Sequence, residues 1–165
     1  TRKNVVDRIV KSGKGTMAQH EHRAELIARM ETNRLYNGLH QGGMEEAAAE
    51  LDEPGRDDPL IRQLDEYFDQ RNSPFSRAAN GIVAALTQPF RVPVAEVKRW
   101  EAQMKRKSGV TKQTLIVGAY YEVPNLPAHF GERARIVPYR ASWDGGAALA
   151  KMTPIQRKGI PEWSG

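Results

Sequence analysis

Hydrophobic residues recur at steps of three and four along a long stretch of the chain, from residue 17 to about residue 51. This spacing predicts an α-helix with one apolar face. Glu31 lies within that face, so its carboxylate would need a hydrogen-bond donor or a cation if it were buried. The dipeptide Gly42-Gly43 is a point at which the helix could break. The predicted stripe consists of Ala24, Ile27, Ala28, Glu31, Leu35 and Leu39.

Two shorter segments also have a helical pattern. Residues 3–12 place valine and isoleucine side chains at helical spacing, and the following glycines favour a flexible loop. Residues 94–107 form the second predicted helix, with Val97 and Met104 on its apolar face. The last turn of this helix holds cations, which the helix dipole favours at that end.

Strand patterns fall mainly in the second half of the chain. The best candidates are residues 114–123 and 135–140, which are rich in β-branched and aromatic residues. Residues 81–94 contain prolines that cannot donate to a sheet ladder, so this segment suits short edge strands or a loop. Residues 60–68 fit either a short helical segment or a strand.

These elements predict an α+β fold. We expect the long N-terminal helix to pack on a small, irregular, mainly antiparallel sheet, with a second helix and an extended C-terminal arm. The expected boundaries are 1–16 for a short helix and linker, 17–140 for the domain, and 141–165 for the arm. Extended arms suit assemblies, because they gain order by docking on neighbours.

Composition agrees with one folded domain. A chain of 165 residues with 39% hydrophobic residues can bury a core. No apolar run approaches about 18 residues and the start lacks the pattern of a secretory leader, so we expect a soluble protein without a membrane span. The absence of cysteine excludes disulfides and cysteine-bound zinc.

Charge is distributed unevenly along the chain. Residues 1–80 hold 12 Lys and Arg against 14 Asp and Glu, whereas residues 81–165 hold 13 against 6. A basic second half favours a polyanionic partner, though a solvated helix face with Trp100 and Met104 packed inward is the stronger interpretation of its basic helix. The cations that could contact nucleic-acid phosphates are Lys98, Arg99, Lys105, Arg106 and Lys107.

Motifs for metal, cofactor or nucleophilic chemistry are missing. The histidines lack the spacing of a metal site, no serine sits in a nucleophile elbow, and SGKGT lacks the spacing of a phosphate loop. We therefore expect no metal, no cofactor and no catalytic residue.

Charged residues far apart in sequence form the strongest constellation. Arginine guanidinium groups can clamp carboxylates through two hydrogen bonds, so we expect a structural polar network in which the later arginines and histidine satisfy carboxylates from the helix and the loop. Its expected members are Glu31, Asp69, Arg71, Arg77, His129, Arg133 and Arg135.

Three motifs carry a resemblance to a known family. The stretch HRAELIARMETNRLYNG (22–38) is similar to the helix that opens the head-morphogenesis domain of phage Mu F-like minor head proteins. Met30 and Leu35 depart from that pattern. The matching positions are Arg23, Ala24, Ile27, Ala28, Arg29, Glu31, Arg34, Tyr36 and Asn37.

Two later motifs follow in the family's order. Residues 69–81 resemble D-x-R-T-x-P-x-C-R-x-x-x-G, and residues 127–138 resemble P-x-H-x-x-C-R-C-x-x-x-P. Ser76, Glu132 and Ala134 stand where that family has cysteines. The matching positions are Asp69, Arg71, Pro74, Arg77, Gly81, Pro127, His129, Arg133 and Pro138.

The resemblance implies a non-enzymatic structural protein of the virion. It would be a minor capsid component of a tailed bacteriophage or phage-like particle, acting near the portal in head assembly or DNA delivery. Its partners would be the portal or major capsid protein and packaged double-stranded DNA, with no membrane involved. Its locations would be the virion and, during assembly, the host cytoplasm.

Two alternatives stay open at this point. The same domain occurs in toxin-like proteins of mobile elements, which would imply a nuclease or transferase using His129 with Asp69 or Glu132. A cellular nucleic-acid-binding module would instead rely on the basic helix 94–107.

Overall fold

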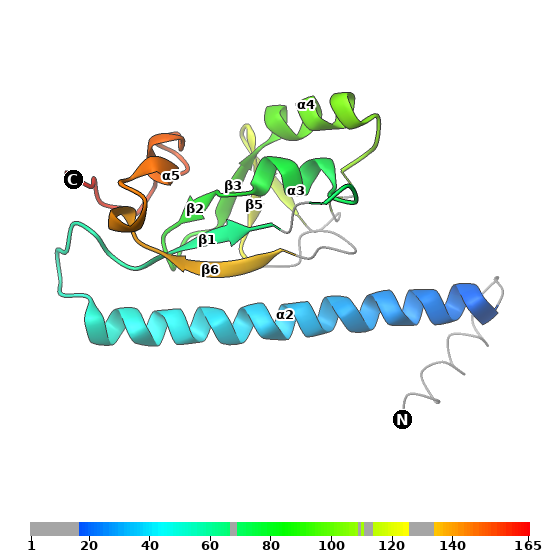
Figure 1. Ribbon diagram of the computed structural model, residues 1–165, viewed down its shortest axis with the longest axis horizontal. Coiled ribbons are helices and arrows are strands. Elements are labelled where there is room, and N and C mark those ends of the chain that lie inside the picture. Colours follow the sequence, from blue (N-terminus) through cyan, green and yellow to red (C-terminus); the bar gives the residue numbers. More distant parts are fainter. Residues whose placement is uncertain (1–16, 67–68, 109, 111–113, 126–133) are drawn as a thin grey trace.

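The computed structural model describes residues 17–66, 69–108, 110, 114–125 and 134–165, and it has the predicted α+β fold (Figure 1). Helix α2 (Met17–Leu51) lies beneath the strands as one continuous rod. It passes through Gly42-Gly43 without a break, so that potential interruption is not used. The helix-forming residues on both sides of the glycines are enough to carry it through.

One three-stranded antiparallel sheet contains β1 (Ile61–Asp65), β2 (Val83–Ala84) and β6 (Arg135–Tyr139), in the order β2-β1-β6. The ambiguous segment 60–68 therefore supplies the central strand β1. Strand β6 confirms the strand predicted at 135–140 and forms an edge of this sheet.

A second antiparallel sheet contains β3 (Phe90–Pro93), β4 (Leu115–Val117) and β5 (Tyr120–Val123), in the order β3-β5-β4. The single strand predicted at 114–123 is in fact the β4–β5 hairpin, because Gly118 reverses the chain at φ +59°. Strands β2 and β3 lie at sheet edges, as expected for the proline-containing segment 81–94.

Two helices cover the strands on the side opposite α2, and they pack against each other (Figure 1). Helix α3 (Pro74–Ala79) begins after Ser73, whose hydroxyl accepts a hydrogen bond from the backbone N–H of Ser76. Helix α4 (Val94–Met104) ends earlier than predicted, because Lys105 takes the left-handed conformation with φ 51°.

The main core lies between the sheets and these two helices, and α2 adds Met44 to it. Val97 of α4 is fully buried, and Trp100 packs against the same cluster, as predicted for the apolar face of that helix. The largest fully buried hydrophobic side chains are Phe75, Phe90, Leu64, Ile136, Val83, Val92, Val97 and Val123.

Residues 141–165 were expected to form an extended arm that docks on neighbours. They contain the 3-10 turn η1 (Ala141–Trp143), the short helix α5 (Ala147–Ala150) and irregular segments that fold back on β1, β2 and β6. Leu149, Ile160 and Trp163 give this segment its own apolar contacts, so it docks within the chain itself. Together with the end of β6 it forms a second, smaller core.

Candidate functional site

Helix α2 is attached to the sheet through a buried asparagine. Asn37 is completely inaccessible to solvent, and its side-chain Oδ1 accepts a hydrogen bond from the backbone N–H of Ile136 at 2.8 Å. Its amide nitrogen donates to the carbonyl oxygen of Asn33 at 2.9 Å. Ile136 belongs to the edge strand β6, and its backbone N–H is not bonded to β1. The contact with Asn37 gives this N–H an acceptor.

The inward face of α2 is therefore different from the one predicted. Its buried or half-buried positions include Met30, Asn33, Asn37, Gln41, Met44 and Ala48. A sheet edge presents backbone N–H and C=O groups, and polar side chains such as asparagine and glutamine can bond to them. The helix covers an edge and not the apolar face of a sheet, so its mixed polar stripe faces inward.

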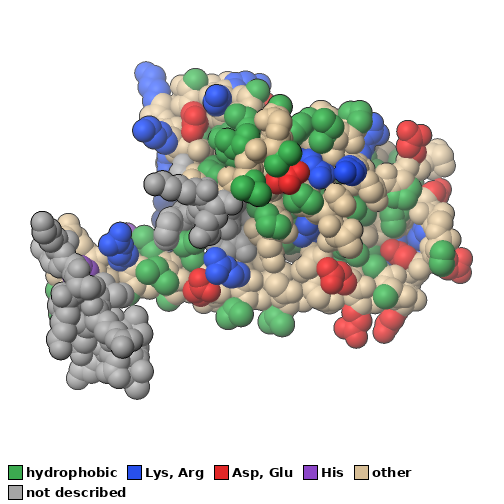
Figure 2. All heavy atoms as spheres, turned by 180° about the vertical axis from the view of Figure 1, so that it is seen from behind, with side chains coloured by type: hydrophobic (Ala, Val, Ile, Leu, Met, Phe, Trp, Pro, Cys, Tyr) green, Lys and Arg blue, Asp and Glu red, His purple; other side chains and the backbone are tan. Residues whose placement is uncertain are grey.

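Most of the predicted apolar stripe faces solvent instead, and Ala24 is its one half-buried member. Ile27 is 44% exposed, Leu35 68% and Leu39 78%. Figure 2 shows hydrophobic side chains projecting from α2 on the side away from the sheets. We call Ile27, Leu35 and Leu39 the outer stripe.

Glu31 lies on the same outward side, and within the described residues its carboxylate pairs only with its own helix. Its side chain is 54% exposed and pairs with Arg34 on the same helix at 3.3 Å. The expectation that Glu31 supplies a buried carboxylate to a distributed clamp is thus wrong, because the exposed group can be solvated. His129 and Arg133, its expected partners, lie outside the described residues.

Asp69 and Arg71, in the turn before α3, lie close to Arg77 inside that helix. The Asp69 carboxylate accepts a hydrogen bond from the backbone N–H of Arg71 at 2.7 Å. Nε of the exposed Arg71 side chain lies 3.7 Å from Oδ2 of Asp69. Arg77 donates to the backbone carbonyl of Asp69 at 3.3 Å, and its guanidinium lies 5.5 Å from the ring centre of Trp100. The motif thus organises the start of α3 and links it to α4.

Arg135 pairs with Asp65, which the sequence did not single out. The two residues are directly opposite on β6 and β1, and Nε of Arg135 lies 2.7 Å from Oδ2 of Asp65. The hydrogen bond and the charge of Asp65 both raise the pKa of Arg135. The sequence did not predict this ion pair, because the pair depends on the antiparallel register between residues 61–65 and 135–139.

A buried arginine, also missed, joins three parts of the fold. Arg62 is 3% exposed, donates to Gln41 of α2 at 3.2 Å and to the Pro124 carbonyl at 3.0 Å, and stacks on the ring of Phe90 at 4.5 Å. Burial lowers the pKa of Arg62 to about 10, so the side chain stays charged at neutral pH. An arginine in a short strand is normally read as a surface residue, so its sequence position gave no signal.

A second missed ion pair secures the connection after α2. Arg140 lies 2.6 Å from Asp52, and both side chains are nearly buried, at 12% and 13% exposure. Arg140 also donates to the carbonyl of Asp58 at 2.5 Å. The pair fastens residues 52–58 to the end of β6.

The cations predicted to contact phosphates are all exposed. Lys98, Arg99, Lys105, Arg106 and Lys107 are all accessible to solvent at α4 and just beyond it. Arg99 forms an ion pair with Glu96 and lies 5.7 Å from the ring centre of Trp100. Figure 2 shows Lys and Arg side chains gathered at the end of the molecule that carries α4, and acidic side chains gathered at the opposite end.

Strand β4 is a second exposed apolar element. It is an edge strand, and Leu115, Ile116 and Val117 are 66%, 60% and 50% exposed. The edge of β6 is covered by α2, and β3 ends at Pro93, which has no N–H to offer. An apolar edge without such protection tends to pair with other chains.

The described residues contain no cluster of three or more side chains suited to hold a metal ion. Within the same residues, no helix has both the length and the apolar character needed to cross a bilayer. Comparison of the chain with protein-family models, curated proteins and solved structures finds no significant match.

Proposed function

We propose that this chain is a structural component of a tailed-phage head or phage-like particle, placed at or near the portal. Two findings support this proposal. The first is the order of three motifs across residues 22–138 that resemble the head-morphogenesis domain. The second, which carries the proposal, is the exposed outer stripe of α2.

The outer stripe has the geometry of a helix contact surface. Its members are spaced by eight and four residues, so they lie on one broad face of the helix over about 18 Å. Scattered exposed leucines are ordinary, but aligned apolar residues on one helix face fit a groove of a partner protein. The partner we assign to this surface is a neighbouring protein of the particle, the portal or the major capsid protein.

The far side of the molecule suits a different partner. Helix α4 lies on the side of the sheets opposite α2 (Figure 1), so both surfaces are accessible at once. Exposed lysines and arginines near α4 can neutralise phosphates, and such contacts do not depend on the base sequence of the DNA. In the proposed arrangement α2 binds protein and α4 approaches the packaged double-stranded DNA.

The exposed apolar side chains of the edge strand β4 also support the proposal. Components of a particle are surrounded by neighbours, so an apolar edge can be covered there that would be a liability in an isolated protein. The proposal therefore accounts for two exposed apolar elements, α2 and β4, through assembly.

Density-gradient sedimentation tests the proposal. Particles from cells that produce the full set of head proteins should carry the chain in a fixed ratio, far below that of the major capsid protein, as measured by quantitative mass spectrometry. The chain should stay bound after washing in high salt, because an apolar helix contact is not screened. A chain found only at the top of the gradient, free of particles, would rule the proposal out.

A further inference from the structure

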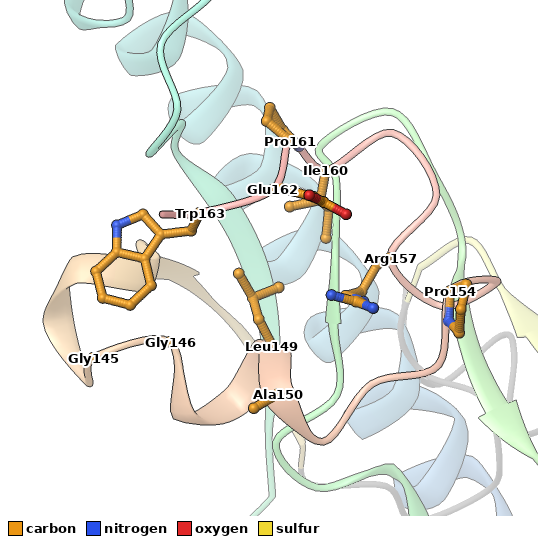
Figure 3. Close-up of a pocket in the computed structure, with 10 residues that line it drawn as sticks. All are labelled: Gly145, Gly146, Leu149, Ala150, Pro154, Arg157, Ile160, Pro161, Glu162 and Trp163. Carbon is orange, nitrogen blue, oxygen red and sulfur yellow. The ribbon is translucent and has the colours of Figure 1, made fainter. Parts of the chain in front are cut away.

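A pocket of about 560 Å³ lies between α5 and the last residues of the chain (Figure 3). Its walls are about half apolar, and Leu149, Ile160 and Trp163 supply apolar surface. Two charged side chains also line it, Arg157 and Glu162. None of these residues takes part in the proposed assembly surfaces, so the pocket needs its own explanation.

Arg157 is the unusual member of the pocket. Its Nε atom is buried, and within the described residues it has no hydrogen-bond partner. Figure 3 shows the guanidinium among the pocket walls, with Leu149 and Ile160 close by. Because Nε is closed to solvent, a ligand in the pocket meets the guanidinium at its terminal nitrogens, which can pair with a carboxylate.

The turn that carries Arg157 is held firmly against the second sheet. The Gln156 side chain is buried, and its amide donates to the carbonyl of Arg91 at 2.8 Å. Arg91 in turn donates to the carbonyl of Ile155 at 3.3 Å, and the Tyr120 hydroxyl lies 2.9 Å from Oγ1 of Thr153. These contacts fix the backbone that leads into Arg157 before any ligand arrives, which lowers the entropy lost on binding.

The opposite wall is fixed by a close approach. Gly146 has φ +76°, and a Cβ atom at this position would lie 2.6 Å from the Trp163 ring. Asp144, two residues earlier, accepts hydrogen bonds from the Tyr139 hydroxyl at 2.6 Å and from the backbone N–H of Ala148 at 3.0 Å. The indole of Trp163 thus lies against the turn at Gly145 and Gly146, with Leu149 between it and Arg157 in the view of Figure 3.

We propose that this pocket binds a ligand with one carboxylate joined to an apolar or aromatic group. The guanidinium fork matches a planar carboxylate, and the leucine, isoleucine and indole surfaces match the apolar part. Glu162 at the pocket adds a negative charge that opposes multiply charged anions such as phosphate. The carboxylate could belong to a small molecule or to the C-terminal residue of a peptide, and the experiment below separates these sources.

The test follows the indole N–H signal of Trp163 by nuclear magnetic resonance on the full chain. The probes are 3-phenylpropionate, its amide, and the peptide acetyl-Ala-Phe with a free or an amidated C-terminus. One or both carboxylates should shift the signal and saturate, and the amides should bind at least about tenfold more weakly, because they lose the charge-assisted hydrogen bond. Binding by the small acid alone assigns a small-molecule site, and tighter binding by the peptide acid assigns a peptide C-terminus.

Variants locate the contact. Arg157→Gln should weaken carboxylate binding by at least about tenfold, whereas Lys158→Gln, an exposed cation on the same turn, should not. The comparison of acid with amide uses the unaltered protein, so it stands even if Arg157→Gln impairs folding. The proposal is overturned if no carboxylate shifts the Trp163 signal, if the amides bind as well as the acids, or if inorganic phosphate competes equally.

Discussion

The side-chain Oδ1 of Asn37 accepts a hydrogen bond from the backbone N–H of Ile136 at 2.8 Å, inside a fully buried contact between α2 and β6. This contact covers the edge of one sheet and lies on the side of α2 that faces inward. The outer stripe is exposed as a consequence. Asn37 therefore acts together with Gln41 and Met44, which also contact the body of the protein, in holding α2 in this orientation.

Replacing Asn37 with alanine should destabilise the protein by about 1–3 kcal/mol, because the buried N–H of Ile136 loses its acceptor. Urea unfolding followed by circular dichroism measures this change. Thr32→Ala is the matched control, since Thr32 is exposed on the same helix and bonds only to its own backbone neighbour, Ala28. Equal free energies of unfolding for the two variants would contradict the proposed role of Asn37.

Asp52 should make stability depend on acid pH. Burial alone would raise the pKa of its carboxyl, but hydrogen bonds from the backbone of Leu60 and from Arg140 outweigh burial and lower the pKa below the ordinary value of 3.8. The folded state therefore binds this proton less tightly than the unfolded chain. Its contribution is fully present above pH 3.8 and is lost as the pH falls through the lower pKa of the folded state.

Asp52→Asn tests this dependence through denaturant unfolding between about pH 6 and about pH 2. The variant should be less stable at the upper end, by about 1–3 kcal/mol, and should lose less stability on acidification. Asp57→Asn changes an exposed carboxylate of the same connection and serves as the control. Parallel curves for Asp52→Asn and the unaltered chain would show that the Arg140 pair carries no pH dependence.

The cations at the end of α4 should govern any affinity for double-stranded DNA. Each phosphate contact that is lost lowers the slope of log affinity against log salt by about 0.9. Replacing Lys105, Arg106 and Lys107 together with glutamine should therefore reduce the slope by as much as about 2.7. Fluorescence anisotropy with a DNA duplex at several salt concentrations measures it.

Lys151→Gln is the control for this series, because Lys151 is exposed in the C-terminal segment and away from α4. If the triple variant has the same slope as the unaltered chain, these cations do not contact DNA phosphates, and DNA is not a partner of α4. That result would not contradict the proposed contact between α2 and a protein.

Local sequence signals predicted the elements better than their orientation. The helical repeat predicted α2, and the β-branched run at residues 135–140 predicted β6. The same repeat gave the wrong inward face, because the usual rule assumes that an apolar stripe meets an apolar surface. A helix that covers a sheet edge places Asn37 there, and this becomes visible only when β6 is known to be an edge.

The polar network was predictable only where its contacts are local. Asp69 and Arg71 lie two residues apart, and the turn motif that contains them indicated their proximity. Arg135 and Asp65 meet through strand register, which no local pattern contains. The sequence likewise gave no sign that Arg62 is buried, since its burial depends on α2, β1 and Phe90 meeting around it.

The outer stripe offers the most direct test of the assembly role. Leu35→Gln/Leu39→Gln removes its most exposed apolar side chains and keeps helix propensity nearly constant. Glu25→Gln/Arg29→Gln is the matched control, because it breaks an exposed ion pair on the same helix. Both double variants should unfold within about 0.5 kcal/mol per substitution of the unaltered chain.

The deciding measurement is the amount of each variant in gradient-purified particles, determined by quantitative mass spectrometry relative to the major capsid protein. We predict that Leu35→Gln/Leu39→Gln is incorporated at least about tenfold less than the unaltered chain, which corresponds to about 1.4 kcal/mol of lost contact. The control should be incorporated normally. Equal incorporation of both variants would contradict the claim that the outer stripe of α2 holds this protein in a particle.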